Sequence, residues 1–447
     1  NRAFSNLTPV GKILLPLLFL VLVVGPILTI ILAVYIGPWL LGILNDNIEI
    51  VRFVVSVTAI LLFSIPAAFI IIYMEMKVIA LMNLRLGPDR VGPAGSLLSV
   101  VHGLKVLMKE DFTPTGADSI VFTWAPVVVF LTAVMTFLVI PFGPGLVGQD
   151  LNIGLLYLFA VGGMTVVGLL MAGWSSFNKY SLVGGLRSAA QVVSYEIPLT
   201  LSVVGLILLA GTMSVNQIGV QQAGWFTDWF VFRQPLGALI FFIAATAEAN
   251  RTPFDLTEAD SEIVAGFATE YSGMRFGFLF FAEYVNVFII SALMVTLYFG
   301  AWNAPFAFPE IQLALDPGQL GNNLVVLLAT APVIFTLAFA APFFLAQSSR
   351  PAWQALLLGF LTFNVVIIGL LFGVTYLGLD WVAGLAWFLL KTFLFVYLFV
   401  WMRGTLPRVR IDQLMGFAWK WLLPAALLNL FLTAAAIVVV DGLRGGL

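Results

Sequence analysis

The chain has 447 residues, of which 61% are hydrophobic and only 9% are charged, whereas soluble globular domains carry about 25% charged residues. This composition excludes an ordinary soluble protein and predicts a chain that lies mainly in lipid. Twenty Lys and Arg residues nearly balance twenty-two Asp and Glu residues, giving a net charge of -2, so no basic surface for nucleic acid is expected.

Several kinds of redox and nucleotide chemistry are excluded by missing residues and motifs. The chain has no cysteine and one histidine, His102, so it lacks the ligands for thiolate-bound iron–sulfur clusters, Cys-based zinc sites and multi-haem cytochromes. No glycine-rich dinucleotide or phosphate-binding motif is present. We therefore expect no metal site and no redox centre in this chain, and any electrons must come from a partner.

Eleven hydrophobic segments follow one another along the chain, each long enough to cross about 30 Å of hydrocarbon as a helix. Their apolar runs are continuous, unlike the alternating strands of a membrane barrel. The first run has no small-residue cleavage site, so we interpret it as a span rather than a signal peptide. We predict an all-α polytopic membrane protein with about eleven transmembrane helices, at roughly 13–36, 52–74, 120–141, 152–173, 190–211, 229–247, 277–300, 324–346, 353–377, 381–402 and 419–440.

The positive charges support this topology. With the N-terminus in the cytoplasm, sixteen of the twenty Lys and Arg residues fall in inner segments, while Arg52, Arg233 and Arg444 fall outside and Lys391 lies within a span. Cytoplasmic loops are expected to collect basic residues. The long, polar inner loops at about 75–119, 174–189 and 248–276 therefore predict that the cytoplasmic face docks a partner or forms a site.

Four ionisable residues lie within or at the ends of predicted spans: Glu196, Glu248, Glu283 and Lys391. Each costs at least about 2.5 kcal/mol in the hydrocarbon region and is by default a candidate for function. The alternative is that they are polar groups satisfied within helix packing, or that Glu248 and Glu283 extend toward the membrane boundary.

The densest polar feature is the inner loop from Glu248 to Glu270, which holds six of the chain's acids. A helix from Asp255 to Ala265, capped by Thr257, would place Glu258 and Glu262 on one face. Like charges at this spacing raise one another's pKa, and burial raises it further, which suits proton exchange near neutral pH. A solvated acidic loop is the alternative, although the interspersed apolar residues disfavour it.

A second inner feature runs from Tyr73 through Glu75 and Lys77 to the Gly-Pro turns of 85–93. A basic flank after a span explains the positive charges but not the acid at the mouth of the span. The following stretch, Leu97–Glu110, is amphipathic and predicts an interfacial helix. His102 within it is interpreted as a surface or packing residue.

Four blocks of mixed residue types together resemble the H subunit of NADH-quinone oxidoreductase, the bacterial counterpart of NADH dehydrogenase subunit 1 of respiratory complex I. They are Glu75–Gly95, the segment from Gly173 through Gln191-Val-Val-Ser-Tyr-Glu-Ile-Pro, the acidic loop 248–273, and Trp401-Met-Arg-Gly-Thr-Leu-Pro-Arg-Val-Arg through Lys420. Met76 departs from the family pattern, which usually has Arg at this position, so one chamber charge is absent.

The resemblance implies an eight-helix core with additions. The core would occupy residues 52–301 and 380–447, with an extra N-terminal span in 1–51 and two inserted spans in 302–379. Residues of the core would form the membrane side of a quinone chamber, namely Glu75, Lys77, Arg85, Arg90, Arg251, Asp255, Glu258, Asp260 and Glu262. A proton-coupling path would follow through Glu196, Glu248, Glu270, Glu283 and Lys391.

The resemblance also implies the setting of the protein. Quinone would be the substrate, and the iron–sulfur clusters, FMN and NAD would be bound by partner subunits of the hydrophilic arm. Further partners would be small and antiporter-like membrane subunits, in the plasma membrane of a bacterium. Two alternatives stay open here: the equivalent subunit of a hydrogenase- or ferredoxin-linked relative, and a standalone cation transporter.

Overall fold

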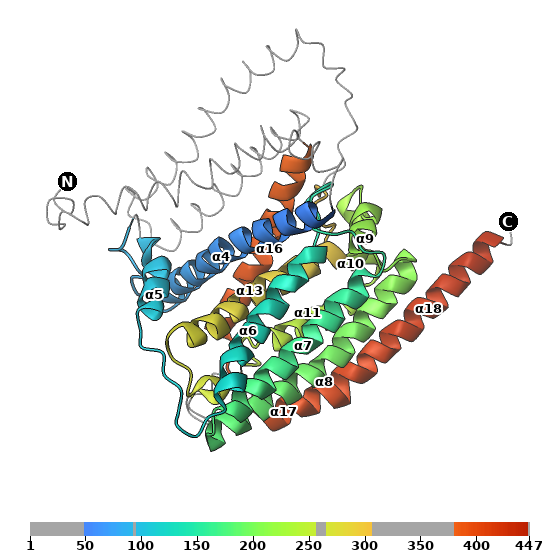
Figure 1. Cartoon of the computed structure of the whole chain (residues 1–447). Coiled ribbons are helices and arrows are strands. Elements are labelled where there is room, and N and C mark those ends of the chain that lie inside the picture. The colour runs from blue at the N-terminus through green and yellow to red at the C-terminus, as the bar shows by residue number, and fades with distance from the viewer. Residues whose placement is uncertain (1–48, 93–94, 256–264, 306–379, 446–447) are drawn as a thin grey trace, which may run out of the picture. The chain divides into compact units, whose positions relative to one another are not determined.

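The computed structural model describes residues 49–92, 95–255, 265–305 and 380–445. Residues Ile60–Leu447 form one compact unit, separate from Asn1–Ala59, and the contacts given below are those of the larger unit. The regular secondary structure of the described residues is helical, apart from one isolated bridge between Gly143 and Leu146. The predicted all-α class is therefore confirmed (Figure 1).

The first group of helices comprises α4 (Glu49–Met82), α5 (Leu98–Leu107), α6 (Ser119–Thr136) with the 3-10 turn η3 (Phe137–Val139), α7 (Gly154–Ser175) and α8 (Lys179–Ala210). Short elements follow, namely α9 (Val215–Gln221), η4 (Phe226–Asp228) and α10 (Phe230–Arg233). The remaining elements are α11 (Pro235–Glu248), η5 (Gly266–Ala268), α13 (Gly273–Tyr298), α16 (Asp380–Thr405), α17 (Ile411–Phe417), the π-helical turn η6 (Ala418–Leu422) and α18 (Leu423–Gly445).

Within these described ranges, seven helical segments are long and apolar enough to cross a membrane. They match seven of the predicted spans. The predicted span at 229–247 is divided, because α10 ends at Arg233 and α11 begins at Pro235, which leaves a shorter apolar helix of 14 residues. The predicted spans at 13–36, 324–346 and 353–377 lie outside the described residues.

Helix ends in this bundle are fixed by local sequence. Asp118 caps α6, its carboxylate accepting from the backbone N–H of Ile120 at 3.2 Å, and Asn178 caps α8 in the same way through Tyr180 N–H at 2.9 Å. Side-chain acceptors at this position satisfy N–H groups that have no partner inside the helix. Gly211 ends α8 in the left-handed region at φ +67°, which glycine adopts without strain.

Helix α8 lies against several neighbours, and glycines permit the closest approaches. A Cβ at Gly173 of α7 would lie 3.0 Å from the Cα of Gly185 on α8. A Cβ at Gly184 would lie 2.6 Å from backbone atoms of Gly266 in η5. Because backbone atoms cannot yield as a flexible side chain can, these glycines allow α8 to contact both α7 and the polar loop that precedes α13.

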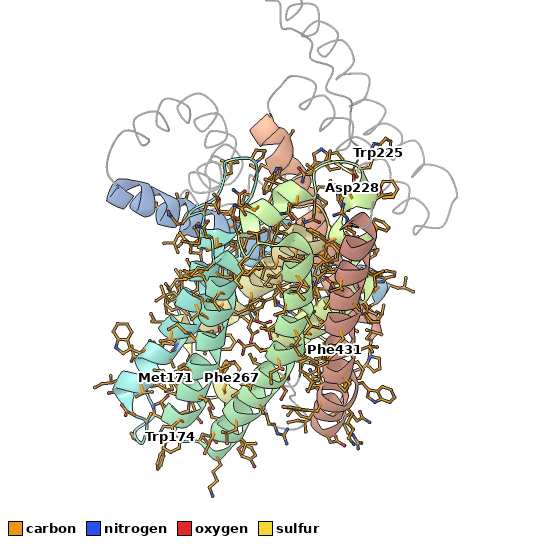
Figure 2. The ribbon with its side chains drawn as sticks, turned by 90° about the vertical axis from the view of Figure 1, so that its right-hand side faces the viewer. Met171, Trp174, Trp225, Asp228, Phe267 and Phe431 are labelled. Atoms are coloured by element: carbon orange, nitrogen blue, oxygen red, sulfur yellow. The ribbon has the colours of Figure 1, made fainter. Side chains whose placement is uncertain are left out.

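The two ends of the bundle carry different loops. Figure 2 shows Trp174 at one end and Trp225 with Asp228 at the opposite end. Their exposed fractions of 75% for Trp174 and 52% for Trp225 suit side chains at the membrane–water interface, where tryptophan is enriched. Loops expected on opposite sides of the membrane are therefore at opposite ends of the structure.

Candidate functional site

A cavity of about 990 Å³ opens beside α4, α5 and α13. Its walls are mainly apolar, and the charged side chains that line it are Glu75, Arg85, Lys105 and Lys109, together with His102. The apolar walls include Phe69 and Ile72 of α4, Val106 of α5, and Phe280, Phe281 and Tyr284 of α13. The predicted helix over 97–110 is confirmed as α5 (Leu98–Leu107), and it forms one wall of this cavity.

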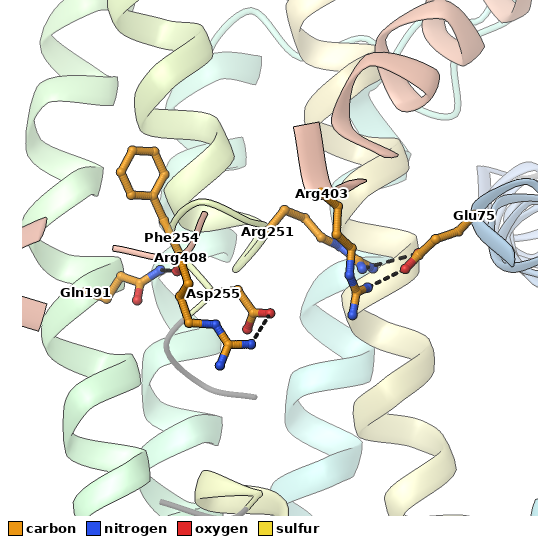
Figure 3. A network of polar contacts seen from close by, with 7 residues as sticks. All are labelled: Glu75, Gln191, Arg251, Phe254, Asp255, Arg403 and Arg408. Atoms are coloured by element: carbon orange, nitrogen blue, oxygen red, sulfur yellow. Dashed lines mark hydrogen bonds and ion pairs between the residues drawn. The ribbon is translucent and has the colours of Figure 1, made fainter. Parts of the chain in front are cut away.

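Glu75 is the buried charge of the cavity wall, with an exposed fraction of 7%. Two arginines from distant parts of the chain bind it. Arg251 Nη1 lies 3.4 Å from one carboxylate oxygen, and Arg403 Nη1 donates to the other. Figure 3 shows the two guanidinium groups meeting the carboxylate from the same side. Residues 75, 251 and 403 therefore form one cluster, although they belong to three separate segments.

Arg251 is buried to the same degree as Glu75, at 7% exposure, and its guanidinium carbon lies 4.3 Å from the centre of the Tyr284 ring. Burial lowers the pKa of the Arg251 guanidinium, but the carboxylate of Glu75 and other nearby groups, Glu283 among them, raise it by more. The net shift of the pKa is upward, so Arg251 stays charged. A buried charge of this kind is tolerated only when it is paired.

Asp255 forms a second ion pair close to the first. Its carboxylate, with the residue 3% exposed, lies 3.2 Å from Arg408 Nη2. The backbone adds a further contact, because Val409 N–H donates to Pro253 C=O at 3.0 Å. The turn after α11 is thus joined to the segment between α16 and α17 through both side chains and main chain.

Gln191 of α8 positions this same turn. Its side-chain amide is fully buried, and the amide nitrogen lies 2.8 Å from Ala247 C=O, 2.7 Å from Phe254 C=O and 3.1 Å from Asn250 Oδ1. Figure 3 shows Gln191 beside Phe254 on the side of the network away from Glu75. The Gln191 amide therefore binds the backbone at both ends of the turn that carries Arg251.

The far end of the acidic loop is fixed on both α8 and α6. Ser181 Oγ donates to Phe267 C=O at 3.0 Å, and Tyr271 stacks on Phe122 with ring centres 4.1 Å apart. Burial raises the pKa of Tyr271 to about 12, so its hydroxyl is a neutral donor to Phe122 C=O at 3.2 Å. The predicted acids Glu258, Asp260 and Glu262, and most of the predicted helix around them, lie outside the described residues.

Two predicted coupling acids face the same point on α7. A Cβ at Gly163 would lie 3.3 Å from Glu196 Oε1, and a Cβ at Gly162 would lie 3.8 Å from Glu248 Oε1. The neighbouring glycines thus face one carboxylate from α8 and one from α11. The side chains of Glu196 and Glu248 are each only partly buried.

The other predicted coupling residues have separate surroundings. Glu270 accepts from Asn178 Nδ2 at 2.6 Å, close to the start of α8. Glu283 lies on α13, where its charge acts on Arg251. Lys391 is buried in α16 and donates to Phe299 C=O at 2.8 Å and Asn303 C=O at 2.9 Å. These contacts favour the alternative in which Lys391 is satisfied within helix packing, here at the end of α13.

The predicted basic entrance residues are less enclosed. Lys77 is half-buried, and its ammonium lies 5.9 Å from the centre of the Tyr73 ring. Arg85 is exposed and lines the cavity, whereas Arg90 is exposed and is not among the lining residues. His102 is exposed at the cavity wall, and no cluster of three metal-binding side chains occurs within the described ranges.

Sequence reasoning missed three residues of the network: Gln191, Arg403 and Arg408. The sequence feature that could have indicated the two arginines is the segment from Trp401 to Arg410. It places Arg403, Arg408 and Arg410 around a proline at the end of a predicted span. Gln191 had a weaker signal, a polar amide near the start of a predicted span. Pairing each of them with its partner required the fold, because the partners lie 56 or more positions away.

Comparison with known proteins identifies the family. A sequence model of the NADH dehydrogenase family matches residues 54–351 and 348–434. The H subunit of NADH-quinone oxidoreductase from Brevibacillus brevis is 40% identical over 389 residues, covering 87% of this chain and 94% of the relative. An H subunit from Koribacter versatilis is 41% identical, covering 85% and 91%, and the H subunit from Bacillus cytotoxicus is 41% identical, covering 80% and 86%. The chain belongs to the family of NADH-quinone oxidoreductase H subunits, the membrane subunit of complex I.

Proposed function

We propose that this chain forms the membrane side of the chamber in which quinone is reduced, and that the ion-paired acid at the chamber wall begins the path that couples reduction to proton translocation. The observation that carries the proposal is the cavity beside α4, α5 and α13, with buried Glu75 in its wall. The subunit works with other subunits of complex I, and neither a standalone transporter nor a hydrogenase-linked relative is favoured by the family membership.

The cavity suits a quinone in size and polarity. Ligand pockets typically enclose about 300–1,000 Å³ and are mostly apolar with a few placed polar groups. The walls supplied by α4, α5 and α13 meet both conditions. An isoprenoid tail requires an apolar route from the lipid, and we propose that this route passes the amphipathic helix α5, which lines the cavity.

The chain's own residues handle protons rather than electrons. Reduction of a quinone to a quinol takes up two electrons and two protons, and we assign the electrons to an iron–sulfur cluster in a partner subunit, because this chain has no cysteine. The FMN and NAD sites also belong to partners. We assign to Glu75 and to the acids of the 248–270 loop the role of holding or passing protons near the reacting ring.

The ion pair between Glu75 and Arg251 couples the cavity wall electrostatically to the acids of the helix bundle. Arg251 binds Glu75 and lies three residues after Glu248. A change in charge at Glu75 alters the electrostatic energy of the Arg251 guanidinium. Coulomb energies between charges about 4 Å apart reach about 4 kcal/mol at an effective dielectric constant near 20. We propose that this change in electrostatic energy affects the protonation of Glu248 and Glu196 in turn, and then that of Glu270 and Glu283. Lys391 is the least supported member of the path, since its contacts are carbonyls.

The predicted topology supports a proposal for the setting of the site. We propose that the loop end with α5, η5 and the 406–410 segment faces the cytoplasm and the hydrophilic arm, and that the N-terminus is also cytoplasmic, in the plasma membrane of a bacterium. Lys77, Arg85 and Arg90 would then lie at the chamber entrance, with Asp255, Glu258, Asp260 and Glu262 in its charged wall.

Steady-state kinetics of the assembled complex test the proposal. Glu75→Gln keeps the shape of the side chain but removes the charge that Arg251 and Arg403 bind. We expect NADH oxidation coupled to quinone reduction to fall at least ~10-fold, which corresponds to about 1.4 kcal/mol, while NADH oxidation by an artificial acceptor at the hydrophilic arm stays unchanged. Glu110→Gln, an exposed acid in the loop after α5, is the control. Equal quinone reduction by the Glu75→Gln and parent complexes would contradict the proposal.

A further inference from the structure

The segment that follows α5 lies directly against the first residues of α13. Ser272, the residue before α13, donates from its Oγ to Glu110 C=O at 3.1 Å. Gly273 begins α13 at φ +56°, and a Cβ there would lie 3.1 Å from Lys109 C=O and 3.3 Å from the Cβ of Asp111. The absence of a side chain at Gly273 therefore allows the main chains of the two segments to meet.

Arg275 adds a side-chain contact to this junction. Its Nε lies 3.3 Å from Asp111 Oδ2, and the pair is partly buried. Its guanidinium carbon also lies 5.2 Å from the centre of the Phe122 ring on α6. Arginine can make both contacts because its planar guanidinium directs N–H donors outward in its plane and offers its face to a ring. Arg275 therefore joins the segment after α5 to both α13 and α6.

The Phe122 ring is a firm support for Arg275. Phe122 is fully buried, and it stacks on Tyr271 with ring centres 4.1 Å apart. The Tyr271 hydroxyl in turn lies 3.5 Å from Ser175 Oγ at the end of α7. By contrast, α5 has only one buried residue, Ser99, and a segment with few buried contacts is easily displaced. The junction at Arg275 therefore holds a weakly packed helix against a well-packed part of the bundle.

Both helices at this junction form walls of the cavity. A Cβ at Gly277 of α13 would lie 3.2 Å from Cγ1 of Val106 on α5, and both residues line the cavity. Met274 and Phe276 line it as well, whereas Arg275 between them is not among the lining residues. Arg275 can therefore affect a molecule in the cavity only through the position of the walls.

We propose that Arg275 is a positioning residue, which holds the C-terminal end of α5 against α13 through Asp111 and thereby sets the width of the cavity near Val106 and Gly277. Arg275 has this role only if the proposed function holds, in which an isoprenoid tail passes this part of the cavity. Partly exposed ion pairs contribute little to overall stability. The loss of Arg275 therefore affects the passage of the tail rather than the assembly of the complex.

Quinone reduction by the assembled complex tests this role with a matched control. We expect Arg275→Gln to raise the KM for a long-tailed quinone ~3-fold or more, with kcat nearly unchanged and with little change in the KM for a short-tailed quinone. Arg275→Lys should restore part of the loss, because it keeps the charge but not the planar group. The control is Arg233→Gln, because Arg233 makes the same two kinds of contact, with Asp228 at 3.8 Å and with the Phe230 ring at 5.7 Å, but does not line the cavity.

A double variant tests whether Arg275 acts through Asp111. Arg275→Gln and Asp111→Asn should each raise the KM for the long-tailed quinone. The two changes together should raise it no further than Arg275→Gln alone, because the residues form one pair. Effects on KM that multiply in the double variant would overturn the assignment.

Amide hydrogen exchange of residues 98–107 in the assembled complex measures how firmly α5 is held, whether or not quinone enters the cavity. Exchange should be faster in Arg275→Gln than in the parent, and unchanged in Arg233→Gln. Unchanged exchange in Arg275→Gln would overturn the proposal, even if the KM rises. Faster exchange with an unchanged KM would also overturn it, whereas the proposed function would still stand if Glu75→Gln lowers quinone reduction.

Discussion

At the residue scale, Glu75 is held by charges that the chain brings from far away. Met76 replaces the arginine that the resemblance leads one to expect, so no base stands directly after Glu75 on α4. Arg251 and Arg403 supply the positive charge instead, one from the turn after α11 and one from the end of α16. Breaking a buried ion pair costs more than the pair contributes, because the remaining charge stays buried.

Removing one of the two arginines should therefore weaken the binding of the Glu75 carboxylate, while the other arginine stays paired with it. In Arg403→Gln we expect kcat/KM for quinone to fall ~10-fold, about 1.4 kcal/mol, because Glu75 keeps only Arg251. The matched control is Arg410→Gln, an exposed arginine seven positions later, which should behave as the parent does. Initial rates over a range of quinone concentrations in membranes measure both.

The ion pair between Glu75 and Arg403 also predicts that the effects of changing the two residues on kcat/KM are not additive. Once Glu75→Gln has removed the carboxylate, the further change Arg403→Gln should cost much less than it does alone, because residues in one ion-pair network couple by about 0.5–3 kcal/mol. Fully additive losses in kcat/KM would mean that Arg403 acts through some group other than Glu75.

At the scale of elements, α8 organises the acidic loop. Gln191 binds the turn before residues 256–264, and Gly184 with Ser181 binds η5 after them. The loop therefore begins and ends on one helix, which also carries Glu196 about one and a half turns beyond Gln191.

The role of Gln191 has a well-matched control in the chain. Gln222 is equally buried and also joins several segments, donating to Thr296 C=O at 2.9 Å and accepting from Gly300 N–H at 3.0 Å, but at the other end of the bundle. We expect Gln191→Leu to raise the KM for quinone and to lower the number of protons moved per NADH oxidised, because the turn with Arg251 loses its anchor. Gln222→Leu should lower only the amount and thermal stability of the complex. If both variants change KM and stoichiometry alike, Gln191 has no special part in the site.

The contact between α8 and η5 gives a second prediction at this scale. A Cβ at Gly184 would lie 2.6 Å from the backbone of Gly266, so Gly184→Ala should displace η5 and expose the acidic loop to added protease. Gly416→Ala is the control, because a Cβ there meets no atom within 4 Å. Equal rates of cleavage in the two variants would show that the contact does not hold the loop.

Much of the element-scale structure could be predicted from sequence, and the failures have two different causes. Long apolar runs predicted α4, α6, α7, α8, α13, α16 and α18, because length and hydropathy are local properties. The run at 229–247 forms two helices rather than one continuous helix, because Pro235 begins a new helix after α10 ends at Arg233. For the site, Glu75 and Arg251 were found as residue types, but the pairing of Glu75 with Arg403 depends on helix packing that no local pattern contains.

At the scale of the whole molecule, polar chemistry is divided between the two ends of the bundle. The end with α5, η5 and α17 carries the cavity wall and the ion pairs of Glu75 and Asp255. At the opposite end, the Gln222 amide and the Lys391 ammonium bond mainly to backbone groups. This asymmetry is what a subunit needs if its charged face meets a hydrophilic arm on one side only.

The absence of cysteine from the chain makes the topology easy to test. Single cysteines can be introduced as Thr115→Cys, in the loop before α6, and Thr227→Cys, in η4 before α10, and both positions are exposed. A membrane-impermeant maleimide should label Thr227→Cys in intact cells and Thr115→Cys only after the membrane is opened. Labelling of both from outside would contradict the assignment of the faces.

The central claim is that the cavity beside α4, α5 and α13 admits quinone to the neighbourhood of Glu75. The most direct measurement is a map of the assembled complex prepared with a quinone that carries its isoprenoid tail. The account predicts density for the tail between Phe69, Val106 and Phe281, with the ring leading toward Glu75 and its two arginines. Quinone density elsewhere, with this cavity closed or filled by side chains of a partner, would contradict it.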